Sequence, residues 1–163
     1  MPDRLVISNT SPLLYLFQVG HLELLEKLYR KVWIPHAVRD ELRAGATRGV
    51  PVPETESFPW LKIQLLRDKT LLPVVVDLGS GEAEAIALAV ANPGSLLILD
   101  DSLGRKIARL NGVTFTGTLG VLVKAKLEGF LPSVGPVIAE LRKTTMHLTP
   151  GLIDSILKEA GEA

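Results

Sequence analysis

Short apolar runs alternate with helical patterns along most of the chain, and this alternation limits the folds that it can adopt. β-rich apolar runs occur at residues 4–8, 32–34, 95–99 and 113–115. Continuous apolar runs are typical of parallel strands that are covered on both faces. Because helical stretches separate the strands, right-handed βαβ units are expected. The sequence therefore predicts an α/β fold in which a mostly parallel central sheet lies between layers of helices.

The helices between and after these strands are predicted from apolar spacing and from end signals. They are expected at residues 13–19, 22–28, 36–44, 82–91, 103–110, 119–127, 134–142 and 151–160. Pro12 suits the first position of the first helix. Residues 45–58 are rich in Gly, Pro, Thr and Glu and predict a loop. Residues 60–66 predict an edge strand, and residues 73–78 predict a further extended segment.

Length and composition set the class of protein. The chain has 163 residues, of which 47% are apolar, so we expect residues 1–163 to form a single domain with 149–160 as its C-terminal helix. There is no cysteine, which excludes disulfides and zinc–thiolate sites. The apolar runs are shorter than the roughly 20 residues that span a bilayer, and the N-terminus lacks a signal-peptide pattern. We therefore expect a soluble, cytoplasmic protein with no membrane contact.

Polar side chains follow two of the predicted strands directly. Asn9, Thr10 and Ser11 come after the first strand, and Asp100 and Asp101 come after the strand at 95–99. In open parallel sheets, sites form just beyond the carboxyl ends of the strands. If these two strands are neighbours, about 4.8 Å apart, the two clusters can share a cation.

Two further acids are candidates for the same site. Glu82 opens a predicted helix, and Glu41 lies on a helix soon after a short strand. Converging carboxylates repel one another, and a hard divalent cation relieves that repulsion. Mg²⁺ or Mn²⁺ takes oxygen ligands and keeps several waters. Such a site can activate water against a phosphodiester.

Each of these residues also has a purely structural interpretation. One of residues 9–11 would cap the first helix, and Asp101 or Ser102 would cap the helix that follows them. Glu82 would favour the macrodipole of its own helix. Glu41 belongs to a charged helix, for which a solvated face is typical. The case for a site therefore depends on the shared placement of these residues at strand ends.

Basic residues near the acids are candidates for contacts with nucleic acid. Arg105, Lys106 and Arg109 recur along the helix after the acidic pair, and Lys124 and Lys126 lie on a later helix. Lys and Arg total 18, as do Asp and Glu, so the net charge is zero and only a local patch would attract phosphate. Arg105 is the nearest of these to Asp100 and Asp101, and it would either hold phosphate or form an ion pair with these acids. For the lysines, the alternative is an ordinary solvated face.

Other motifs exclude some functions. There is no Walker-type loop, and Gly79-Ser80-Gly81 lacks the third glycine of a dinucleotide fingerprint. The three histidines have no metal-ligand spacing. The run 117–120 (Gly-Thr-Leu-Gly) either presents backbone N–H groups to an anion or forms a plain helix-start turn. A small-molecule α/β protein of another kind is the least favoured function.

Five segments resemble motifs of the PIN-domain family. Residues 6–13 resemble the opening of these proteins, an apolar strand followed by Asp-Thr-Ser. Residues 34–42 resemble the second acidic motif of the family, residues 81–86 the third and residues 97–105 the fourth. Residues 117–126 are similar to a prokaryotic subgroup related to the VapC-type toxin ribonucleases. The similarity covers nearly the whole chain, and the order and spacing of the motifs are specific.

The resemblance implies a PIN-like three-layer α/β/α sandwich and a metal-dependent ribonuclease. It implies three or four acids that bind Mg²⁺ or Mn²⁺, with Asn9 in the first place, Glu41 in the second, Glu82 in the third and Asp101 or Asp100 in the fourth. Thr10, Ser11, Arg105, Lys106 and Arg109 are then the expected contacts to RNA. Frequent homodimers and a toxin neutralised by an antitoxin protein are also implied.

Two positions qualify this expectation. Glu84 is two residues after Glu82 and projects about 200° away around a helix, hence off the site. Asn9 stands where the family normally has Asp, so one negative charge is missing. The sequence therefore leaves two functions open: an active Mg²⁺- or Mn²⁺-dependent endoribonuclease, or a weakened module that binds RNA or a protein without cutting.

Overall fold

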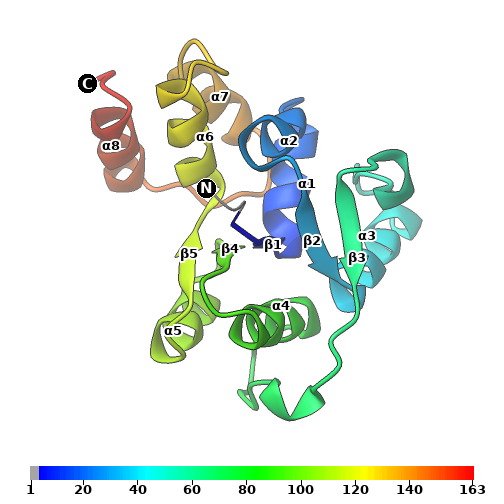
Figure 1. The fold of residues 1–163 in the computed structure, drawn as a ribbon. Helices are drawn as coiled ribbons and strands as arrows, with labels where there is room; N and C mark the ends of the chain where they lie inside the picture. Colours follow the sequence, from blue (N-terminus) through cyan, green and yellow to red (C-terminus); the bar gives the residue numbers. More distant parts are fainter. Residues whose placement is uncertain (1–3) are drawn as a thin grey trace.

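A five-stranded sheet forms the centre of the computed structural model, which describes residues 4–163 (Figure 1). The strands are β1 (Val6–Ser8), β2 (Val32–Pro35), β3 (Leu61–Gln64), β4 (Leu96–Ile98) and β5 (Thr114–Thr116). Their order is β3-β2-β1-β4-β5, and every neighbouring pair is parallel. The two strands that carry the polar clusters, β1 and β4, are neighbours.

Eight helices surround the sheet in the described part of the chain. They are α1 (Thr10–Gln18), α2 (Glu23–Tyr29), α3 (His36–Thr47), α4 (Ser80–Ala91), α5 (Ser102–Leu110), α6 (Thr118–Leu127), α7 (Gly135–Leu141) and α8 (Pro150–Glu159). Two short 3-10 turns, η1 (Thr55–Ser57) and η2 (Lys69–Leu71), flank β3. None of the helices in residues 4–163 combines the length and the apolar composition that a membrane span needs.

The central strands bury side chains on both faces. In β4, Leu96 and Ile98 belong to one apolar cluster, whereas Leu97 belongs to the other. Successive side chains of a strand point to opposite faces, so an uninterrupted apolar run fills two cores at once. Helices α4 and α5 cover one face, and α1, α2, α6 and α7 cover the other (Figure 1). This arrangement confirms the predicted three-layer α/β/α sandwich.

Two predicted boundaries and one predicted extended segment were wrong. The first helix begins at Thr10 rather than residue 13, so Pro12 is its third residue. Proline is tolerated there, because the N–H groups of the first turn have no acceptor within the helix. Helix α3 continues to Thr47 into the predicted loop at 45–58. The predicted extended segment at residues 73–78 is interrupted by a turn after Val75, in which Asp77 adopts a left-handed φ of 72°.

Candidate active site

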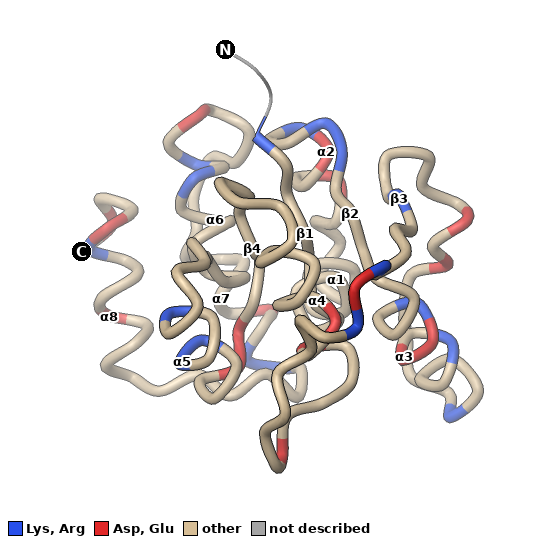
Figure 2. Tube along the Cα trace, turned by 60° about the horizontal axis from the view of Figure 1, so that its bottom comes forward, with Lys and Arg blue, Asp and Glu red and all other residues tan. Residues whose placement is uncertain are grey.

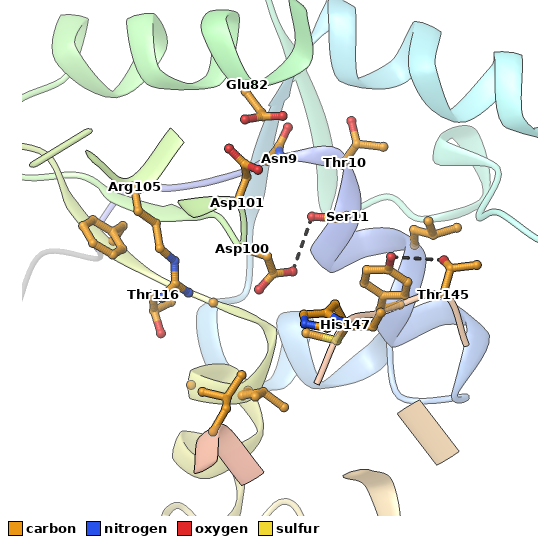
Figure 3. A pocket seen from close by; sticks show the side chains of 18 of the residues that line it. Asn9, Thr10, Ser11, Glu82, Asp100, Asp101, Arg105, Thr116, Thr145 and His147 are labelled. Atoms are coloured by element: carbon orange, nitrogen blue, oxygen red, sulfur yellow. Dashed lines mark hydrogen bonds between the residues drawn. The ribbon is translucent and has the colours of Figure 1, made fainter. Parts of the chain in front are cut away.

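Strand pairing brings the two polar clusters together at the carboxyl edge of the sheet. Ser8 is in register with Ile98, and the N–H of Asn9 donates to the carbonyl of Ile98 at 3.0 Å. On the other side of β4, Leu99 N donates to Thr116 O at 2.8 Å. Because pairing continues one residue past each strand, Asn9 and the acidic pair face a common pocket of about 760 Å³ (Figure 3).

Asp100 is held by the start of α6. Its Oδ1 accepts from the N–H of Thr118 at 2.7 Å, and its Oδ2 accepts from the Thr118 hydroxyl at 2.7 Å and from Ser11 Oγ at 3.3 Å. Thr118 is fully buried. The run 117–120 is therefore a helix start whose N–H binds an anion, and that anion is a carboxylate of the same chain. Sequence reasoning missed Thr118 as a partner of the acids.

Asp101 is held by the start of α5. It occupies the N-cap position, and its Oδ2 accepts from the N–H of Gly104 at 2.8 Å. The capping interpretation of Asp101 is thus correct, and the residue also lines the pocket. One residue therefore serves both the helix and the pocket.

Glu41 is held by the start of α4. Its Oε2 accepts from the N–H of Gly81 at 2.8 Å, and its Oε1 accepts from the Thr10 hydroxyl at 2.7 Å. A Cβ on Gly81 would lie 2.6 Å from Oε2, so only glycine allows this approach. The expectation of a solvated face for Glu41 was wrong, because α3 packs beside α4 and turns the carboxylate into the pocket.

Asn9 and Glu82 each have a buried side-chain oxygen without a hydrogen-bond donor, unlike Asp100, Asp101 and Glu41. Asn9 is 4% exposed, and its Oδ1 is buried without a hydrogen-bond partner in this chain. Glu82 Oε2 is likewise buried without a donor. The predicted cap by one of residues 9–11 was wrong: Asn9 occupies the N-cap position of α1, but no side chain caps this helix. Figure 3 shows Asn9, Glu82 and Asp101 directed toward one another.

The pKa of Glu82 is raised to about 7. Burial is the largest cause, since it disfavours the charged form, and hydrogen bonding to Asp101 comes second. The negative charges of Asp101 and Glu41 raise it further. A proton shared between Glu82 and Asp101, or a cation, would satisfy the oxygen that has no donor.

Of the three basic residues predicted on α5, the structure places only Arg105 at the pocket. Arg105 lines the pocket, donates from Nε to Leu99 O at 2.8 Å and lies 5.2 Å above the Phe115 ring. Arg109 lies 5.3 Å from the same ring but outside the pocket lining. Lys106 is exposed and is also outside it, because consecutive residues of a helix lie about 100° apart.

Charge elsewhere is mixed, and Glu84 lies away from the acids. Figure 2 shows Lys and Arg on α2, α3 and α5, interspersed with Asp and Glu. Glu84 does not line the pocket; its Oε1 accepts from Ala37 N at 3.4 Å. Both Thr10 and Ser11 donate their hydroxyls to the acids. Their predicted contact with RNA stays a prediction.

The inner part of the pocket fits a hard divalent cation with few protein ligands. Within residues 4–163, no group of three or more His, Cys, Asp and Glu side chains lies close enough to hold a metal ion alone. Two carboxylates, Glu82 and Asp101, face the amide oxygen of Asn9, and two of these oxygens lack donors. Mg²⁺ requires only one or two carboxylates because it keeps several waters.

The α/β/α sandwich with acids at the carboxyl edge of its parallel sheet is the architecture that the resemblance in the sequence implies. A family model described as a PIN domain matches residues 5–162, and the chain belongs to this family. Neither the comparison with curated proteins nor the comparison with solved structures found a match. The family therefore follows from a match over nearly the whole chain, in agreement with the motifs in the sequence.

Proposed function

We propose that the protein is a Mg²⁺- or Mn²⁺-dependent endoribonuclease. The observation that carries this proposal is the pair of buried oxygens without donors, Asn9 Oδ1 and Glu82 Oε2, beside Asp101. Buried polar atoms in folded proteins nearly always have a partner. A hydrated divalent cation is the partner that suits an amide oxygen and two carboxylates.

Asn9, Glu82 and Asp101 would hold the cation, which when bound activates water and neutralises charge on the phosphodiester. A bound cation would offset the burial and the negative charges of Asp101 and Glu41 that raise the pKa of Glu82, so Glu82 would bind it as a carboxylate. Glu41 and Asp100 accept hydrogen bonds from helix N–H groups and would stay fixed beside this centre as two further carboxylates. Arg105 would contact the phosphate.

Cleavage of a labelled single-stranded RNA tests this proposal. We expect cleavage with Mn²⁺, none with EDTA, and at least a hundredfold loss in Asp101→Ala and in Glu41→Ala. Glu140→Ala is the control, because Glu140 is an exposed carboxylate paired with Lys143 away from the pocket. Cleavage that persists in both pocket variants would rule out this centre.

A second candidate is a module that binds RNA or a protein without cutting. Asn9 favours it, since a neutral amide in the first acidic place binds a divalent cation more weakly than a carboxylate. If Asn9→Asp creates cleavage that the natural chain lacks, the natural chain is a binder. Equal cleavage by both forms would exclude this candidate.

Two finer proposals concern partners. The resemblance of residues 117–126 to toxin-related proteins supports a toxin that an antitoxin protein neutralises, and a homodimer. Growth arrest on expression, relieved by the product of a small neighbouring upstream gene, would support the first. A solution mass of two chains would support the second.

A further inference from the structure

The pocket has a second wall, opposite the inner acids, that the proposed chemistry does not use. Its residues are mainly apolar or aromatic: Leu14, Tyr15, Met146, His147, Leu152 and Ile156. Figure 3 shows His147 and Thr145 across the pocket from Glu82 and Asp101, with Asp100 between them. The acids and this wall therefore border the same space.

The wall is held in place by hydrogen bonds of the segment that joins α7 to α8. The hydroxyls of Tyr15 and Thr145 lie 3.1 Å apart, which ties the segment to α1. The N–H of Met146 donates to Thr144 Oγ1 at 3.2 Å, and Thr144 Oγ1 donates to the carbonyl of Leu141 at 2.6 Å. These bonds hold Tyr15 and the residues just before His147 at the wall of the pocket.

Charge alone gives little affinity for nucleic acid at this pocket. Among the described residues that line it, Arg105 is the one Lys or Arg, against five carboxylates. The whole chain has no net charge. Binding through phosphates requires several cations. A nucleic acid would therefore need a source of affinity other than its backbone.

We propose that Tyr15, Met146 and His147 form a nucleobase subsite for single-stranded nucleic acid, a proposal that rests on the proposed function. Every base has a π-face, and stacking on an aromatic side chain supplies affinity without phosphate contacts. Bases of a duplex are already stacked and cannot enter such a pocket, whereas single strands can present them. A base on this wall would place the adjoining phosphodiester toward Asp100 and Asp101.

Binding of a short single-stranded RNA that carries 2-aminopurine tests the subsite. The experiment is run in EDTA, so that no cleavage is needed and failure of the catalytic proposal is seen separately in the cleavage assay. We expect quenching of the base fluorescence on binding, and about tenfold weaker binding with loss of quenching in His147→Ala and in Tyr15→Leu, since one stacked base is worth about 1–3 kcal/mol. Tyr15→Phe, which keeps the ring, should retain the quenching.

Two controls make the result specific. His21→Ala should bind like the natural chain, because His21 lies in the turn between α1 and α2 and outside the pocket. The logarithm of the affinity should fall with the logarithm of salt concentration with a slope of about −1, because each single-strand phosphate contact contributes about −0.7. Melting curves show that each variant is folded.

Several outcomes would overturn the subsite. They are binding without quenching, unchanged binding in both His147→Ala and Tyr15→Leu, equal binding of duplex RNA, a salt slope typical of many phosphates, and no binding of the oligonucleotide at all. A pocket that instead binds a protein segment would give the last of these. Cleavage that fails while quenching persists would reject the nuclease and leave the subsite standing.

Discussion

Of the four acids at the inner end of the pocket, three accept a backbone N–H from the first turn of a helix, and Glu82 accepts none. Charged acceptors are stabilised near helix N-termini by the unpaired N–H groups there. Asp100, Asp101 and Glu41 are therefore each held by the start of a helix. For Glu82, burial and the neighbouring acids raise the pKa.

This difference predicts a pH-dependent stability. The pKa of Glu82 is about 7 in the folded protein against 4.5 ordinarily. Between these values the folded protein keeps a proton that the unfolded chain has released, so the free energy of unfolding falls as pH rises. Glu82→Gln stays neutral and escapes this loss. At pH 8 we expect the free energy of unfolding of the variant to exceed that of the natural chain by about 1–2 kcal/mol after allowance for solvent screening. At pH 4 the two free energies should be equal.

Thermal unfolding followed by circular dichroism at the two pH values measures the effect. Glu140→Gln is a suitable control, since its carboxylate is exposed and remote from the pocket. A stability difference between Glu82→Gln and the natural chain that is the same at pH 4 and pH 8 would contradict the assigned pKa.

At the scale of elements, helix starts and glycines work together. The starts of α4, α5 and α6 converge on the acids, and Gly81, Gly104 and Gly117 lie in or just before their first turns. A Cβ on Gly117 would lie 2.8 Å from Asp100 Oδ1, and one on Gly104 would lie 3.0 Å from Glu82 Oε2. Small residues at these positions let helix backbones approach the carboxylates directly.

Gly81→Ala should reverse the usual effect of alanine in a helix. Alanine normally stabilises a helix by up to about 1 kcal/mol relative to glycine. At Gly81 the new Cβ displaces the Glu41 carboxylate and breaks a hydrogen bond to a charged group, which is worth about 1.5–3 kcal/mol. We expect a net loss of about 1–2 kcal/mol in urea unfolding. Gly151→Ala is the matched control, since nothing lies within 4 Å of its Cβ; a stabilised Gly81→Ala would refute the contact.

At the scale of the whole molecule, a residue shortly after the C-terminal helix ties this end of the chain to the start of α7. Glu162 accepts from the N–H groups of Val134 and Gly135 at 2.7 and 3.0 Å and pairs with Lys126 at 2.9 Å. These bonds lower the pKa of Glu162 to about 2, the backbone bonds being the largest cause. Because α8 supplies Leu152 to the second wall of the pocket, this anchor also supports the proposed subsite.

Glu162→Gln should therefore loosen α8 without unfolding the sheet. The stabilisation from a lowered carboxyl pKa is present above the ordinary value of 4.5 and is lost as pH falls toward 2. We expect faster amide hydrogen exchange in α8 of the variant at pH 7 and unchanged exchange in β1 and β4. Glu159→Gln serves as the comparison, and equal exchange of α8 in the natural chain and Glu162→Gln would exclude the anchor.

Much of the fold could be predicted because its signals are local. The apolar runs identified β1, β2, β4 and β5. The sequence left open whether β1 and β4 are neighbours, and strand pairing in the structure shows that they are. The errors came where a distant contact overrides a local pattern. Glu41 lies in a charged helix that predicts a solvated face, yet the N–H of Gly81, 40 residues away, binds it.

The sequence by itself determined the alternation of strands and helices, the edge of the sheet where the acids gather and the family. These follow from periodicity, from the geometry of parallel strands and from motif order, all of which are written in consecutive residues. Only the tertiary structure decided how each acid is held and that the pKa of Glu82 is raised. The N–H that binds Asp100 comes from Thr118, 18 residues on, and the oxygen that no group binds on Glu82 exists because helices from separate parts of the chain close around it.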